Sequence, residues 1–146
     1  MTDLKLQPPR RWNETVAGYL WLPRLIDKVR AFQTGTLGAY SYPSYLDRAF
    51  LGQLGLSPAF IERTVSQSET DEAIGRAVRD QTGHTLEQIQ RANESFERRW
   101  RFFLALMDTD EGHVKGRGYP IPRWLQPIVW RFYQRWAARK ASAQHL

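Results

Sequence analysis

The chain has 146 residues, of which 42% are hydrophobic and 25% charged, with no cysteine and a formal net charge of +6. This composition is typical of a soluble globular protein and excludes disordered, collagen-like and membrane-spanning chains. Without cysteine, thiolate nucleophiles, cysteine-ligated zinc and disulfides are also excluded. The positive charge and six tryptophans favour an acidic partner. The start lacks the features of a secretory signal, so we expect a cytoplasmic protein of a bacterial cell.

The amino-acid usage favours helices. Leucine and alanine together number 28, whereas valine and isoleucine number 12, and strand-like alternation is nowhere sustained. We predict an all-α, mainly helical fold of five to six helices in a single compact domain over 1–146. Residues 1–11 form an extended arm in this prediction, and residues 112–146 form a basic, aromatic-rich loop and C-terminal helix.

The first two helices are predicted from their end signals. Pro23 suits the first turn of a helix that ends near Gly35. Ser44 suits the N-cap of a second helix, because Asp47 follows three residues later, and Gly55 ends it.

Three further helices are expected in the middle of the chain. They run from Ser57 to Val65, from Thr70 to Gly83, and from a capping box at Thr85 and Gln88 through Met107. In the last of these segments, the apolar residues continue on one face of a helix from the capping box to Met107, so it is the longest predicted helix.

The positive charge gathers near the C-terminus. Residues 1–111 contain 14 Lys and Arg and 15 Asp and Glu, whereas residues 112–146 contain seven and none. A last helix is expected from about Pro122 to Ala141, with Trp124, Ile128, Phe132 and Trp136 on one line and Arg131, Arg135 and Arg139 along its margin.

Three roles are open for this basic helix. A wide apolar stripe favours docking on the domain core, with the arginine stems lying along it. The alternatives are an anionic membrane surface and nucleic-acid phosphates, both bound through Arg131, Arg135 and Arg139. Trp130 lies opposite the stripe, which leaves a neighbouring element, a homodimer partner or a ligand as its contact.

The segment from Asp108 to His113 collects oxygen and nitrogen groups that metals use as ligands. It fails as an EF-hand, because Gly112 is misplaced and Tyr119 occupies the twelfth position in place of glutamate. No paired-histidine spacing supports zinc either. We therefore predict no metal and no cofactor.

Polar and aromatic residues that suit a small-molecule site are densest in the N-terminal third. Asp27 and Asp47 are the candidate catalytic residues, each as a general base. Arg24 and Lys28 suit a carboxylate or phosphate, with aromatic side chains orienting the ligand. The candidate ligand-binding residues are Tyr19, Trp21, Arg24, Lys28, Tyr40 and Tyr42. The helical spacing of Arg24, Asp27 and Lys28 also fits a purely structural ion pair, the more common role of such neighbours.

At these residues the sequence resembles a family of small bacterial proteins known as domain of unknown function 5069. The resemblance is carried by residues 3–10, 18–31, 35–42 and 46–56. It covers the first half of the chain and thins out after the segment Thr70-Asp71-Glu72, so the basic C-terminus looks like an extension. The resemblance implies a small helical domain and no known activity.

Two functions from different classes follow. The first is a protein that binds a small anionic or polar molecule in a pocket lined by Tyr, Arg and Asp. A cofactor-independent enzyme that transfers a proton to or from this molecule is a more specific form of the same hypothesis. The alternative is an interaction protein whose C-terminal helix binds nucleic acid, an anionic membrane surface or a protein partner.

Overall fold

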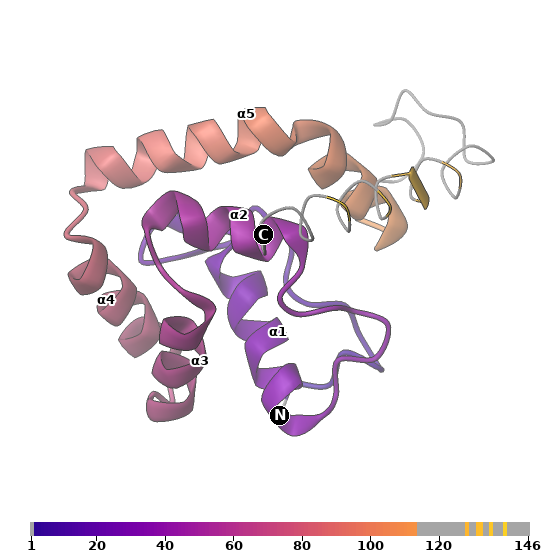
Figure 1. Cartoon of the computed structure of the whole chain (residues 1–146), viewed down its shortest axis with the longest axis horizontal. Coiled ribbons are helices and arrows are strands. Elements are labelled where there is room, and N and C mark those ends of the chain that lie inside the picture. The colour runs from indigo at the N-terminus through magenta and orange to yellow at the C-terminus, as the bar shows by residue number, and fades with distance from the viewer. Residues whose placement is uncertain (1, 114–127, 129–130, 133–134, 136–138, 140–146) are drawn as a thin grey trace. The chain divides into compact units, whose positions relative to one another are not determined.

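The structure is a computed structural model that describes residues 2–113, 128, 131, 132, 135 and 139. Over these residues the chain forms five α-helices and one two-stranded hairpin, which confirms the mainly α fold (Figure 1). Its contacts form two compact units, residues 1–98 and 99–146, and each is described by itself. A single domain over the whole chain stays a prediction.

The helices begin and end close to the predicted residues. They are α1 (Leu22–Thr34), α2 (Tyr45–Leu54), α3 (Pro58–Gln67), α4 (Asp71–Thr82) and α5 (Leu86–Asp110). Gly35, Gly55 and Gly83 follow α1, α2 and α4 in the left-handed conformation, which glycine adopts without steric cost.

The capping box predicted at Thr85 and Gln88 is present, and the predicted N-cap Ser44 forms a second one with Asp47. Ser44 Oγ accepts a hydrogen bond from the Asp47 amide at 3.2 Å, and the Ser44 amide donates to Asp47 Oδ2 at 2.8 Å. At the start of α5, the Thr85 amide donates to Gln88 Oε1 and the Gln88 amide to Thr85 Oγ1, at 2.8 and 3.2 Å. These bonds satisfy amides that have no partner within their own helix.

A hairpin that the sequence did not predict precedes α1. Strands β1 (Thr15–Val16) and β2 (Tyr19–Leu20) pair antiparallel, with Thr15 opposite Leu20 and Val16 opposite Tyr19. It packs closely on α4, because a Cβ added at Gly75 would lie 2.7 Å from Val16 Cγ1 and 2.8 Å from Ala17 Cβ. The hairpin and α4 therefore depend on a glycine at position 75.

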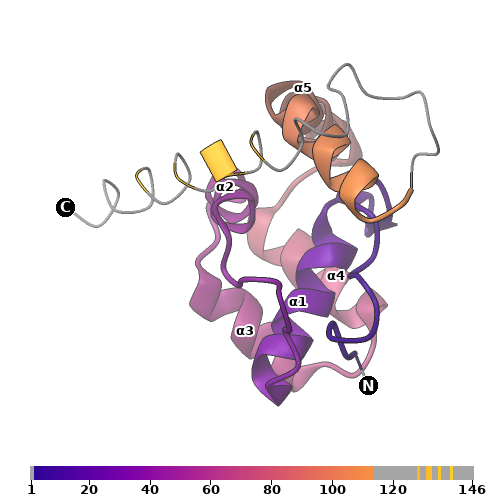
Figure 2. The same cartoon turned by 90° about the vertical axis from the view of Figure 1, so that its right-hand side faces the viewer.

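The core of residues 1–98 is built around α1, which contacts β1, α3 and α4 (Figure 2). The largest fully buried side chains in this unit include Tyr19, Trp21, Leu22, Leu25, Ile26, Leu46, Leu51, Ile61, Ile74 and Ile89. Phe96, in the first half of α5, packs its ring against Trp21 and Phe50, with ring centroids 5.5 and 6.0 Å apart. Hydrophobic burial around α1 therefore fixes the position of that helix.

The N-terminal arm contacts α1 at two points. Near the end of α1, the Leu4 amide donates to the Thr36 carbonyl at 2.9 Å. Farther along the arm, Arg10 donates to the Pro23 carbonyl and to Asp27. The arm approaches Gly38 so closely that an added Cβ would lie 3.1 Å from Lys5 Cα, and Gly38 has a positive φ of 62°.

In the unit formed by residues 99–146, the described part contains the last turns of α5, where Trp100 and Phe103 lie with ring centroids 6.0 Å apart. Farther along the chain, Ile128, Arg131, Phe132, Arg135 and Arg139 have helical backbone and exposed side chains. The predicted helix from Pro122 to Ala141 otherwise lies outside the described residues. No helix in the described part of the chain is long and apolar enough to cross a membrane.

Candidate functional site

Three charged side chains of α1 are buried. Arg24, Asp27 and Lys28 are 3%, 7% and 4% exposed, and Asp47, at the start of α2, is 0% exposed. Buried charges cost desolvation free energy and persist only where they are paired and hydrogen-bonded. The contacts of Asp27, Lys28 and Asp47 divide these three residues between two clusters, and Arg24 contacts a residue of each.

The first cluster joins α1 to the N-terminus of α2. Lys28 Nζ lies 2.5 Å from Asp47 Oδ2 and 3.2 Å from Ser44 Oγ. The Trp21 indole nitrogen donates to the other oxygen, Asp47 Oδ1, at 3.0 Å. With the Ser44 amide, three groups thus donate to the two Asp47 oxygens, and these bonds fix the position of the carboxylate.

The second cluster joins α1 to the arm and to α4. The Arg10 guanidinium donates to Asp27 Oδ1 at 3.0 Å and to Asp71 Oδ2 at 2.6 Å, and the Arg10 amide donates to Asp27 Oδ2 at 2.8 Å. Arg30 Nη2 lies 3.1 Å from Asp71 Oδ1. Burial alone would raise the pKa of Asp71, but the hydrogen bond and charge of Arg10, together with Arg30, lower this pKa below its ordinary value.

Arg24 has contacts with the arm and with two aromatic rings. Its Nη1 donates to the Arg10 carbonyl at 3.3 Å. Its guanidinium carbon lies 5.4 Å from the ring centroid of Trp21 and 5.7 Å from that of Tyr40, within the range of cation–π contacts. The two rings orient a buried cation beside the first cluster.

Tyr42 carries a buried hydroxyl that has no hydrogen-bond partner among the described residues. Its ring packs against Phe32 of α1, with centroids 5.1 Å apart. Burial raises the pKa of Tyr42, and the nearby charges of Glu62 and Asp47 raise it further. The hydroxyl therefore stays protonated near neutral pH and is available as a donor.

These contacts define one face of α1, which we call the loop face. Arg24, Lys28 and Phe32 follow one another at intervals of four residues and so share a side of the helix. The segment 36–44 lies along this side, with Tyr40 on Arg24, Ser44 on Lys28 and Tyr42 on Phe32.

Two of the residues predicted for the site lie apart from the loop face. Asp27 bonds to Arg10 on the arm side of α1. The Tyr19 hydroxyl lies 2.9 Å from Thr82 Oγ1 and 3.0 Å from His84 Nδ1, at the end of α4. The loop face gathers the other predicted residues, which are Trp21, Arg24, Lys28, Tyr40, Tyr42 and Asp47.

Sequence reasoning misses four members of the two clusters. The position of Ser44 indicates only a helix cap, although its hydroxyl also contacts Lys28. No local pattern assigns Arg10, Arg30 or Asp71 to the site, although Asp71 pairs with both arginines. The signal for Arg10 was its place in segment 3–10, one of the stretches that carry the family resemblance.

The described C-terminal residues are exposed, and docking of their apolar stripe on the core stays a prediction. Ile128 and Phe132, which belong to this stripe, are 46% and 66% exposed. Arg131, Arg135 and Arg139 are exposed as well. Trp124, Trp130 and Trp136 lie outside the described residues.

The acidic segment after α5 contains one close pair, His113 Nε2 and Glu111 Oε2, whose distance is 3.6 Å. Over the part of the chain that the structure describes, no group of three His, Asp or Glu side chains is arranged to hold a metal ion.

Comparison with known proteins places most of the chain in one family. The model described as "Domain of unknown function (DUF5069)" matches residues 6–112, which include both clusters and all of α1 to α5. The match extends beyond the first half of the chain, where the resemblance was apparent, and ends before the basic C-terminal residues. No curated protein matches the chain. The chain therefore belongs to the DUF5069 family.

Proposed function

We propose that residues 1–98 bind a small anionic molecule at the loop face of α1. The observation that carries the proposal is the burial of Arg24, Lys28 and Asp47 against one short segment. Apolar side chains would fill the same volume without the desolvation cost of charged ones. Buried ionisable groups gathered in this way are typical of functional sites.

The chemistry of the loop face favours an anion. Arg24 offers a planar guanidinium held by two rings, and Tyr42 offers a protonated hydroxyl. Lys28 adds a second positive charge, shared with Asp47. Donors of these types recognise phosphate and carboxylate groups.

Binding is better supported than proton transfer. Both oxygens of Asp47 already accept hydrogen bonds, and both oxygens of Asp27 accept them from Arg10. A general base needs an oxygen directed at the substrate proton. A cofactor-independent proton-transfer activity with Asp27 or Asp47 as base, and a cytoplasmic location, stay predictions.

The experiment is a thermal-unfolding titration of the full chain with inorganic phosphate, pyrophosphate and citrate at constant ionic strength. A ligand that binds only the folded state raises the unfolding temperature in proportion to its occupancy. We expect at least one of the three anions to raise it, and we expect Tyr42→Phe to reduce that shift.

Two control variants make the titration specific. Tyr45→Phe removes a tyrosine hydroxyl at the start of α2 and should leave the shift unchanged. The triple variant Arg131→Gln, Arg135→Gln, Arg139→Gln removes exposed charges that attract any anion, and it should also keep the shift. The proposal is wrong if none of the anions shifts the wild type, or if only the triple variant loses the shift.

A further inference from the structure

The net charge of the protein belongs to one of its two units. Residues 1–98 contain 12 Lys and Arg and 12 Asp and Glu, so that unit is neutral. Residues 99–146 contain nine Lys and Arg and three Asp and Glu, which is the whole excess of +6. A neutral unit is therefore joined to one that attracts anionic partners.

The described residues of the C-terminal stretch form one mixed surface, which we call the arginine face: Ile128, Arg131, Phe132, Arg135 and Arg139. At about 100° per residue, these five helical positions fall within roughly 100° of arc. Ile128 and Phe132 are 46% and 66% exposed, and the three arginines are exposed beside them. Apolar and cationic side chains thus point to the same side.

We propose that the arginine face binds the surface of an anionic lipid membrane. Helices of this kind lie in the headgroup region, where apolar side chains enter the acyl boundary and cations contact lipid phosphates. Arginine suits this position, because its long apolar stem lies beside the inserted residues while its guanidinium reaches the phosphates. No acidic residue occurs from 112 to 146 to oppose the approach.

The apolar residues favour lipid over nucleic acid. A single-stranded nucleic acid stacks its bases on aromatic rings, and Phe132 offers a ring for this. The aliphatic Ile128, exposed one turn before it, offers no stacking surface, whereas an acyl boundary accepts both side chains equally.

The test is co-sedimentation of the full chain with vesicles of phosphatidylcholine alone, or of phosphatidylcholine mixed with phosphatidylglycerol. We expect partitioning onto the mixed vesicles at least about tenfold stronger than onto the neutral ones, and weakening with salt. Equal binding to both vesicle types, or binding to neither, overturns the proposal.

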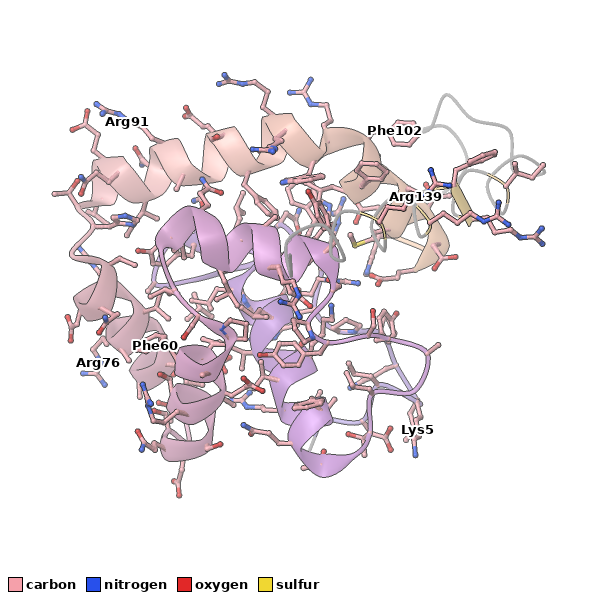
Figure 3. The ribbon with its side chains drawn as sticks, viewed as in Figure 1. Lys5, Phe60, Arg76, Arg91, Phe102 and Arg139 are labelled. Carbon is pink, nitrogen blue, oxygen red and sulfur yellow. The ribbon has the colours of Figure 1, made fainter. Side chains whose placement is uncertain are left out.

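Matched variants separate the two contributions. Phe132→Asp should reduce partitioning about tenfold, because it removes inserted apolar surface and adds a negative charge. The triple variant Arg131→Gln, Arg135→Gln, Arg139→Gln should reduce it further. Arg76→Gln, an exposed arginine of α4 that Figure 3 shows pointing away from its helix, should leave it unchanged. Partitioning that Phe132→Asp does not reduce overturns the insertion step.

A labelled single-stranded oligonucleotide gives the competing outcome. If the chain binds the oligonucleotide through Arg131, Arg135 and Arg139 but does not sediment with anionic vesicles, the lipid proposal is wrong and the face binds nucleic acid. Circular dichroism of each variant checks that its helices are intact.

Discussion

Lys28 Nζ lies 2.5 Å from Asp47 Oδ2, and the side chains of both residues are almost completely buried. The pair joins the middle of α1 to the first turn of α2, two helices whose sequences are separated by the segment 36–44. The same carboxylate caps α2 and accepts the Trp21 indole hydrogen bond. The Asp47 carboxylate thus links α1, α2 and the end of the segment 36–44 around the loop face.

Asp47→Asn should destabilise the fold by about 3 kcal/mol, because it leaves the Lys28 ammonium buried beside a neutral group. Urea unfolding measures the change. Adding Lys28→Met to this variant should recover part of the loss, since the uncompensated charge is then removed.

The matched control is an exposed pair on α5. Arg91 Nη2 lies 2.9 Å from Glu87 Oε1, and both side chains are more than 70% exposed. Glu87→Gln should therefore change the free energy of unfolding by less than about 1 kcal/mol. A loss for Asp47→Asn as small as this would show that the buried pair contributes little.

Gly75→Ala should destabilise the protein by about 1–3 kcal/mol, because the new Cβ would lie within 3 Å of Val16 and Ala17 in the hairpin. Gly52→Ala provides the opposite case, since position 52 lies within α2 and a Cβ there would meet no atom within 4 Å. It should stabilise the protein by about 0.5–1 kcal/mol. Thermal unfolding measures the stability of both variants. If Gly75→Ala and Gly52→Ala change the stability in the same direction, the close packing of the hairpin on Gly75 is contradicted.

Asp71 should make stability depend on pH in the acid range. Its pKa in the folded state is lowered below the ordinary value of 3.8, so its contribution is present above the unfolded pKa and is lost as pH falls through the folded pKa. The difference in unfolding free energy between wild type and Asp71→Asn should therefore shrink from about pH 5 downward. In an Arg10→Gln background the difference should be smaller near neutral pH and should depend less on pH, and an unchanged difference would contradict the role of Arg10.

Tyr42→Phe and Tyr19→Phe should affect the free protein differently. Tyr42→Phe removes a buried hydroxyl that has no hydrogen-bond partner among the described residues, so this variant should leave the free energy of unfolding unchanged or raise it. Tyr19 loses bonds to Thr82 and His84, so its removal should cost about 1 kcal/mol. Equal losses for the two variants would indicate that the Tyr42 hydroxyl has a partner in solution.

Sequence signals located the helices well because those signals are local. A cap such as Ser44 with Asp47, or a glycine such as Gly35, acts within one turn of its helix, so spacing alone reveals it. The hairpin at Thr15–Leu20 escaped notice because two-residue strands are too short for an alternating pattern. Its close contact with Gly75 depends on tertiary packing.

The members of the site were largely predictable, but their partners were not. Helical spacing suggested a local pairing of Asp27 with Arg24, whereas Asp27 pairs with Arg10, 17 residues away in sequence. Arg10 also reaches Asp71, 61 residues away. Such contacts follow from the path of the arm along α1, which no local pattern encodes.

A two-dimensional NMR titration of the full chain with pyrophosphate tests the anion site most directly. We expect the largest shifts at the Arg24 side-chain Nε–H, the Trp21 indole N–H and the backbone amides of Tyr40 and Tyr42, with saturation at a common concentration. Shifts confined to residues 112–146, or a non-saturating drift over all exposed basic residues, would contradict an anion site at the loop face.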